Sequence, residues 1–164
     1  MSSQDHRFPT IGSYGFLSDC HTAALVSFGG DVEWLCFPRF DSPSAFAALL
    51  DRGAGHMRLR PRGVTVPISR RYAPGTLVIE TTWVTETGWA VVKDALTIAD
   101  WVPAGGSELR PGRPQTDHES DRSLLRTITC IDGEVEMEME CLPRFQYGVE
   151  GAKWSGGKLG EATA

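Results

Sequence analysis

The sequence DVEWLCFPRFDSPSAFAALL, residues 31–50, passes from strand signals to helix signals within one short stretch. Its first part, residues 32–36, is β-branched, aromatic and apolar, which is the composition of a buried strand. Pro38 has no N–H to donate to a strand ladder, so the strand should end there. Ser42, followed by a proline, is typical of a helix N-terminus. We therefore predict a buried strand, a tight corner and a short helix over residues 45–50.

The corner of this stretch carries two charged residues around an aromatic one, Arg39, Phe40 and Asp41. A tight strand-to-helix corner is a common way of directing side chains into a cleft. A purely structural joint has the same spacing. The spacing alone therefore leaves both a structural joint and a binding site open.

The length and charge of the chain limit its class. A chain of 164 residues suffices for one domain with one core. Its net charge of −5 argues against nucleic acid or an anionic membrane as a partner, because no basic stripe is present to neutralise phosphates. The N-terminal residues show no secretory signal, and no apolar run has the length of a membrane helix. We therefore expect a cytoplasmic protein.

The four cysteines show no CxxC spacing and occur in apolar, strand-like surroundings. This pattern favours buried reduced thiols over disulfides or a metal site. The cysteines are Cys20, Cys36, Cys130 and Cys141.

Three pairs of strand-like segments are each joined by turn residues, and the last pair is joined by Asp132-Gly133, a strong hairpin signal. With 18 glycines, 10 prolines and one expected short helix, the chain fits an antiparallel all-β sandwich of two sheets. The helix should follow the WLCFPRFDSP strand. The paired segments are residues 23–28 with 32–36, 76–86 with 89–98, and 124–131 with 134–142.

The last of these segments alternates between glutamate and apolar residues. Four carboxylates in a row invite the interpretation of a cation site, but alternating glutamates on a strand ordinarily form its solvent-facing side. We expect that outer role for Glu134, Glu136, Glu138 and Glu140.

Other segments fall outside the strand pattern. We expect residues 1–10 to be a flexible arm, residues 11–154 to form the sandwich, and residues 155–164 to begin a further region. Residues 103–123 form a long polar insert with several prolines and glycines. A loop of this length is either disordered or a lid over a site.

The motif C-x-P-R-F occurs twice, at residues 36–40 and 141–145, each time at the end of a predicted strand. If the two strands run the same way, two Arg-Phe pairs emerge at one rim of the sandwich. Arginine offers a planar fork to hydroxyls and carboxylates, and phenylalanine offers a stacking face, which together suit a sugar or a docking protein surface. Two independent strand ends remain the alternative. The candidate site residues are Arg39, Phe40, Asp41, Arg144 and Phe145.

Sequence motifs for catalysis are missing. The chain contains no GxSxG, HExxH, P-loop or helix-opening GxGxxG motif. Carboxylates are plentiful, but none lies in a pattern that would raise one pKa and lower another. The residues alone therefore predict an all-β domain with a candidate rim and with no catalytic residue.

Residues 11–154 closely resemble the N-terminal β-sandwich domain of bacterial glycoside hydrolase family 15, the glucoamylase and trehalase group. WLCFPRFDSPS, RYAPGTLVIETTW and LLRTITCIDGEVEMEMECLPRFQYGVEGAKW carry this resemblance. The segments LSDCHTAALVS, AGHMRLRP and TGWAVVKDAL favour the trehalase branch.

The resemblance implies that catalysis belongs to a barrel of paired helices that follows the sandwich and is not present in this chain. In that family two carboxylic residues act as general acid and general base in an inverting hydrolysis. The loop 38–41 would point toward the barrel and its pocket. Gln146 stands where the family usually has Asp, which weakens a strict equivalence of the two loops. Family trehalases can respond to phosphate and magnesium, but no residue here identifies a site for either, and no cofactor is evident.

Two hypotheses follow. In the first, the chain is the accessory domain of a hydrolase that acts on trehalose or, alternatively, on a glucoamylase-type α-glucan, and is inactive alone. In the second, it is a free-standing carbohydrate-binding or protein-interaction sandwich, which would need exposed coplanar aromatics such as Trp89, Trp101 and Trp154. Self-association of the parent protein remains open.

Overall fold

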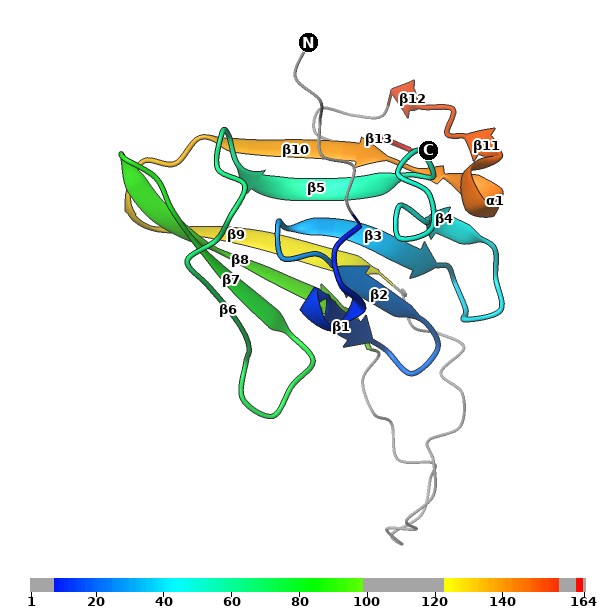
Figure 1. Cartoon of the computed structure of the whole chain (residues 1–164), viewed down its shortest axis with the longest axis horizontal. Coiled ribbons are helices and arrows are strands. Elements are labelled where there is room, and N and C mark those ends of the chain that lie inside the picture. The colour runs from blue at the N-terminus through cyan, green and yellow to red at the C-terminus, as the bar shows by residue number, and fades with distance from the viewer. Residues whose placement is uncertain (1–7, 99–122, 157–161, 164) are drawn as a thin grey trace, which may run out of the picture.

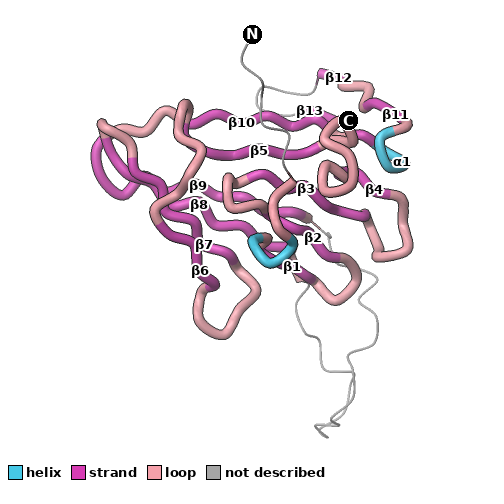
Figure 2. Tube along the Cα trace, viewed as in Figure 1, coloured by secondary structure: helices cyan, strands magenta, loops and turns pink. Residues whose placement is uncertain are grey.

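The computed structural model describes residues 8–98, 123–156 and 162–163 (Figure 1). Almost all of its regular structure is β-strand (Figure 2). A 3₁₀ turn, η1, spans Ile11–Ser13, and a four-residue helix, α1, spans Phe145–Gly148. The longer strands are β1 Gly15–Ser18, β2 Ala23–Val26, β3 Asp31–Cys36, β5 His56–Pro61, β6 Ser69–Tyr72, β7 Ile79–Val84, β8 Gly88–Leu96, β9 Leu124–Gly133 and β10 Met137–Leu142. The short strands are β4 Ser44–Phe46, β11 Glu150–Gly151, β12 Ser155–Gly156 and β13 Ala162–Thr163.

These strands form two packed antiparallel sheets, which confirms the predicted all-β sandwich. Sheet A has the order β1-β2-β3-β5-β10, with β4 paired to the end of β3. Sheet B has the order β6-β7-β8-β9. The strands β12 and β13 form a separate two-stranded pair.

The first two predicted hairpins are confirmed. In sheet A, β2 pairs with β3 and places Leu25 opposite Trp34. In sheet B, β7 pairs with β8 over its whole length. Both hairpins have apolar residues on alternate positions and short turns, which is local information that a sequence carries directly.

The third predicted hairpin is wrong. β9 pairs with β8 in sheet B, whereas β10 pairs with β5 in sheet A, so residues 134–136 cross between sheets. Gly133 does have a positive φ of 67°, but its role is a close approach: a Cβ there would lie 2.1 Å from the carbonyl oxygen of Thr87. The Asp-Gly signal therefore marked tight packing against the neighbouring hairpin and not a two-residue turn.

The prediction of a short helix over residues 45–50 is also wrong. That segment holds β4 and a turn, because β4 pairs with β3 beyond the point where β5 stops pairing. The backbone N–H of Ala48 donates to Gly55 (3.1 Å) and that of Leu49 to Glu33 (3.0 Å). Tertiary strand pairing has overridden the local helix signal. The short helix of the structure is α1, which begins at Phe145, the last residue of the second C-x-P-R-F motif.

The hydrophobic core fills the space between the two sheets. Its larger cluster joins side chains of β1 to β4 with two from sheet B, and a second cluster surrounds the fully buried Trp83. The members of the larger cluster are Leu17, Ala24, Val26, Val32, Leu35, Phe46, Ile79 and Leu96, and those of the smaller are Leu59, Trp83 and Val92.

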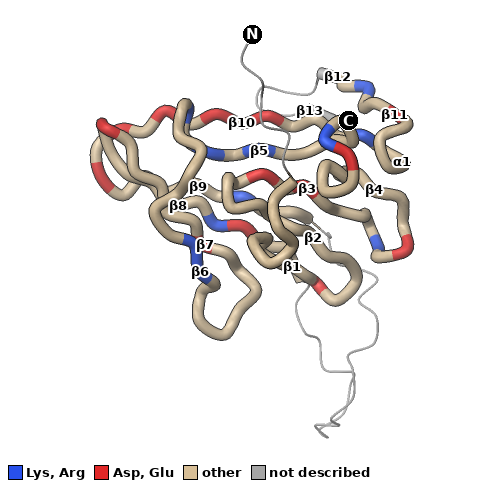
Figure 3. Tube along the Cα trace, in the orientation of Figure 1, with Lys and Arg blue, Asp and Glu red and all other residues tan. Residues whose placement is uncertain are grey.

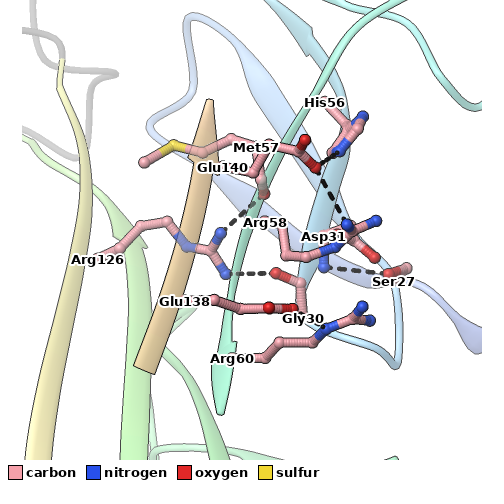
Figure 4. Close-up of polar contacts among 10 residues, drawn as sticks. All are labelled: Ser27, Gly30, Asp31, His56, Met57, Arg58, Arg60, Arg126, Glu138 and Glu140. Atoms are coloured by element: carbon pink, nitrogen blue, oxygen red, sulfur yellow. Dashed lines mark hydrogen bonds and ion pairs between the residues drawn. The ribbon is translucent and has the colours of Figure 1, made fainter. Parts of the chain in front are cut away.

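A buried arginine connects the two sheets through this core. Arg126 of β9 donates from Nε to Asp94 Oδ1 (2.8 Å) and from Nη2 to Asp94 Oδ2 (3.2 Å), with both side chains almost fully buried. Its guanidinium also donates to the carbonyl oxygens of Met57 in β5 (2.9 Å) and of Gly30 in the β2–β3 turn (2.8 Å), as Figure 4 shows. The Arg126–Asp94 ion pair thus lies within sheet B, while the same guanidinium also binds backbone carbonyl groups across the core.

The glutamates of β10 lie on the outer side of sheet A, as expected, but pair with basic residues of β5. Glu140 contacts both Arg58 and His56 at 3.0 Å, and Glu138 accepts from Arg60 at 3.1 Å. Opposite charges are brought together by the register, which places each of these two glutamates opposite its arginine (Figures 3 and 4). Among the described residues this row forms ion pairs and no cation site.

A second polar cluster fixes the N-terminal segment to β3. Glu33, which is buried, accepts hydrogen bonds from the Tyr14 hydroxyl (2.5 Å) and from Arg52 (2.7 Å). Burial, together with the Glu33 carboxylate, raises the pKa of Tyr14 to about 12. Arg52 also lies under the ring of Phe8, 4.7 Å from its centroid.

Two sequence predictions remain untested. The insert at 103–123 lies outside the described residues except for its last residue, and so do residues 1–7 of the predicted arm. In the part of the chain that is described, no helix is long and apolar enough to cross a membrane.

Replacing Arg126 with Met should destabilise the fold by about 3–5 kcal/mol, because the Asp94 carboxylate is left buried without a counter-charge. Urea denaturation of the chain measures this. The matched control is Arg62→Met, whose exposed pair with Glu136 should contribute about 1 kcal/mol or less. Equal effects of the two substitutions would contradict the role assigned to Arg126.

The phenol of Tyr14 should ionise at a higher pH than that of an ordinary tyrosine. Its raised pKa means that the folded state favours the neutral phenol, so its stabilising effect is present below about pH 10 and is lost as the pH rises through about 12. An absorbance titration at alkaline pH checks this. A phenol that ionises near pH 12 in the parent chain should be missing from the Tyr14→Phe variant, and an unchanged curve would refute the assignment.

Candidate functional site

The two C-x-P-R-F motifs emerge at the same end of sheet A. β3 is antiparallel to β5, and β5 is antiparallel to β10, so β3 and β10 run in the same direction. Their ends lie on the right of Figure 1. The two strands that carry the motifs therefore run the same way, which is what a shared rim requires. We call the segments that follow these strands, residues 37–42 and 144–148, the rim.

The first rim segment is a compact loop that displays its candidate residues. The backbone N–H of Arg39 donates to the Ser42 hydroxyl (3.1 Å), and Arg39 Nε donates to Asp41 Oδ1 (2.9 Å). This hydrogen bond and ion pair lower the pKa of the Asp41 carboxyl. Arg39 and Asp41 are both largely exposed, and the Phe40 side chain is 58% exposed. The loop thus presents a fork of donors, a carboxylate and an aromatic face to solvent.

The turn between β1 and β2 supports this loop. The backbone N–H of Phe40 donates to the carbonyl oxygen of His21 (2.8 Å). Asp19 shapes the turn, because its Oδ1 accepts from the backbone N–H groups of His21 (2.8 Å) and Thr22 (2.7 Å). The Thr22 hydroxyl in turn donates to the carbonyl oxygen of Cys36. No signal in the sequence indicated that this turn would contact the rim.

The second rim segment has a different conformation. Arg144 is exposed and Phe145 is half-buried, and both lie in a tight antiparallel bridge to residues 150–151. Gln146 and Tyr147 have left-handed backbones, with φ of 52° and 59°. Left-handed backbone is uncommon for bulky residues and persists only where surrounding contacts hold it.

Tyr147 connects the second rim segment to β3 and β4, although the sequence did not single it out. Its backbone N–H donates to the hydroxyl of Ser44 in β4 (3.0 Å), and its ring lies 6.3 Å from that of Trp34 in β3. Ser44 is fully buried, while the Tyr147 side chain is about half exposed. A pattern search misses such a residue because its position depends on a turn that only the folded chain creates.

The two Arg-Phe pairs are therefore neighbours but not equivalents. Arg39 has its own carboxylate in Asp41, whereas Gln146 binds Glu150 and leaves Arg144 without a carboxylate partner among the described residues. The rim has donors, an acceptor and aromatic faces suited to hydroxyl groups or to a protein surface. Within the described part of the chain, no group of three or more His, Cys, Asp or Glu side chains is arranged to hold a metal ion.

Comparison with known proteins places the chain in a family. The family described as "Trehalase-like, N-terminal" matches residues 4–105. The chain belongs to the trehalase-like N-terminal family. The match includes the first rim segment and the β7–β8 hairpin of this trehalase-like domain, while the second rim segment lies beyond it.

Curated relatives of this trehalase-like domain are named trehalases. A trehalase of Mycolicibacterium smegmatis is 52% identical over 159 residues, which are 96% of this chain and 24% of the relative. A trehalase of Mycobacterium tuberculosis is 50% identical over 159 residues, 96% of this chain and 23% of the relative. Trehalase 1 of Sulfolobus acidocaldarius is 30% identical over 135 residues, 82% of this chain and 20% of the relative. The chain thus spans about a quarter of the first two relatives. No solved structure matches it.

Replacing Ser44 with Ala should loosen the second rim segment, because the backbone N–H of Tyr147 loses its acceptor. We expect amide exchange at Tyr147 to accelerate by roughly fivefold, which corresponds to about 1 kcal/mol. Hydrogen-exchange NMR measures it. Ser27→Ala removes another buried hydroxyl that accepts a backbone N–H, from Asp31, and should leave Tyr147 unchanged. Equal acceleration in both variants would show that the Ser44 bond does not hold the rim.

Proposed function

We propose that this chain is the accessory N-terminal domain of a glycoside hydrolase family 15 trehalase, in which the rim faces the pocket of a helical-barrel catalytic domain. The longer protein would convert trehalose and water into two glucose molecules with inversion. The curated relatives named above support trehalose over a glucoamylase-type α-glucan as the substrate.

One observation supports this location of the interdomain contact: both strand-end motifs emerge at the same end of sheet A, where Tyr147 ties the second rim segment to Ser44 of β4. A single-sided surface with exposed aromatic side chains is suited to a neighbouring domain. The length of the relatives supports a further domain, since this chain matches about a quarter of the first two.

In this proposal each rim residue has a physical task. Arg39 donates to substrate hydroxyls or to loops of the barrel, and Asp41 both accepts hydrogen bonds and orients the Arg39 guanidinium. Phe40 excludes water from the pocket mouth, which strengthens the polar contacts inside. Arg144 and Phe145 extend the wall on the second segment.

Hydrolysis itself is assigned to the longer protein. An inverting pair of carboxyl groups stands about 6.5–9.5 Å apart to admit a water molecule, with one group as general acid and the other as general base. We assign no residue of this chain to that pair, so the chain alone should not hydrolyse trehalose.

A cytoplasmic location completes the proposal. All four cysteines are free thiols, and two of them, Cys20 and Cys130, are exposed. Exposed unpaired thiols fit a reducing compartment.

Replacing Arg39 with Ala in the longer enzyme should lower kcat/KM for trehalose by at least about tenfold, because the rim loses its donor fork. The free energy of unfolding should change by about 1 kcal/mol or less, since the side chain is exposed. Steady-state kinetics and urea denaturation measure the two quantities.

The matched control is Arg62→Ala. Arg62 is as exposed as Arg39, has an exposed carboxylate partner in Glu136, and lies where β5 ends, away from the rim. It should leave kcat/KM unchanged. An unaltered rate in the Arg39 variant, or an equal loss in both, would refute the proposal that the rim forms a wall of the pocket.

A further inference from the structure

An open hollow of about 420 Å³ lies at the tip of the β7–β8 hairpin, at the end of the molecule opposite the rim (Figure 1, left). Its walls include the exposed side chains of Val84 and Trp89, and the carboxylates of Glu86 and Asp132. The volume is within the range of small-ligand sites, roughly 300–1,000 Å³. The proposed function does not use this hollow.

The register of sheet B creates the platform in the hollow. Trp89 stands directly opposite Val84 on one side and Asp132 on the other, so the three side chains form one row across three strands. The neighbours Trp83 and Ala90 are fully buried, which places Trp89 on the outer face. A β-bulge beside Trp89 skips Ile131 and brings Asp132 into the row. Bulges commonly re-aim side chains in this way at functional sites.

The turn that carries the hollow is rigidly held. The Thr85 hydroxyl accepts from the backbone N–H of Gly88 (3.1 Å), and the Thr87 hydroxyl donates to the carbonyl oxygen of Glu134 (2.6 Å). The backbone N–H of Glu134 returns a bond to Thr87 (3.1 Å), and Gly133 allows the two segments to touch. A held turn reduces the loss of conformational entropy on binding.

The chemistry of the hollow selects a class of ligand. In the described part of the chain, neither the Glu86 nor the Asp132 side chain has a hydrogen bond or an ion pair, and no basic residue lines the hollow. Two free carboxylates repel anions and accept hydrogen bonds from hydroxyl groups. A glucose ring has C–H groups on its faces and hydroxyls around its edge, so it stacks on an indole while its hydroxyls reach acceptors beside it.

The geometry points to a second sugar site in this hollow, which binds a neutral glucoside by stacking on Trp89 and by hydroxyl donation to Glu86 and Asp132. The site is separate from the rim and does not depend on the rim facing a pocket. Trp154, also exposed, lies near β12 at the other end and does not share this platform (Figure 1). Trp101 lies outside the described residues.

Titration of the 164-residue chain with trehalose, maltose and glucose, followed by NMR, tests the site. We expect binding in the millimolar range, with shifts at the Trp89 indole N–H and at the amides of residues 85–88 and 132. Trp89→Ala should weaken binding by roughly tenfold or more, because the stacking face is lost. Asp132→Asn keeps the shape of the side chain but removes its charge, and should weaken binding by roughly threefold or more.

Trp154→Ala, which removes another exposed indole outside the hollow, should leave the affinity unchanged. Tetramethylammonium chloride is the second probe, because a cation without hydroxyls also favours aromatic faces beside carboxylates. The proposal is overturned if sugars cause no shifts at up to about 50 mM. It is also overturned if binding survives Trp89→Ala, or if tetramethylammonium binds more tightly than the sugars. None of these readouts involves hydrolysis, so failure of this site and failure of the rim proposal are distinguishable.

Discussion

The buried pair of Arg126 and Asp94 is the constraint on which the arrangement of the two sheets depends. A guanidinium has five donors, and in this fold four hydrogen bonds bind it to one carboxylate and two carbonyl groups. Because the carboxylate belongs to sheet B, while one carbonyl belongs to β5 of sheet A and the other to the turn that joins β2 to β3, all four bonds form only when the sheets are correctly placed against each other. Burial of apolar side chains favours any close packing of the two sheets, whereas this directional contact selects one.

The sequence predicted those parts of the fold that depend on neighbouring residues. The β2–β3 and β7–β8 hairpins follow from alternation and turn residues. The errors arose where a distant strand competed with a local signal. The run that begins at Ser44 pairs with β3 because the second half of β3 extends past His56, where β5 begins. Asp132-Gly133 leads into a crossing between the sheets because the free edge of β5 pairs with β10.

Prediction of the rim had the same limits. The repeated C-x-P-R-F motif suggested a shared rim only on the condition that its two strands run the same way, and the structure meets that condition because β5 lies between them and is antiparallel to both. The supporting contacts of Asp19, Ser44 and Tyr147 had no sequence pattern, since each depends on a backbone turn meeting another segment. The sequence thus indicated that both motifs follow strand ends, while the residues that support those ends gave no signal.

The order of strands in sheet A also determines how this protein is made on the ribosome. β10 adds to the edge of β5 only after every strand of sheet B has been synthesised. Until then β5 has an open edge, and until β9 is made the carbonyls of Gly30 and Met57 lack the Arg126 guanidinium that binds them. Long-range pairing of this kind makes folding slow and cooperative. A nascent chain that stops just before residue 137 therefore holds every strand of sheet B but leaves sheet A without β10, and stalled translation there would yield a substrate for chaperones or proteases.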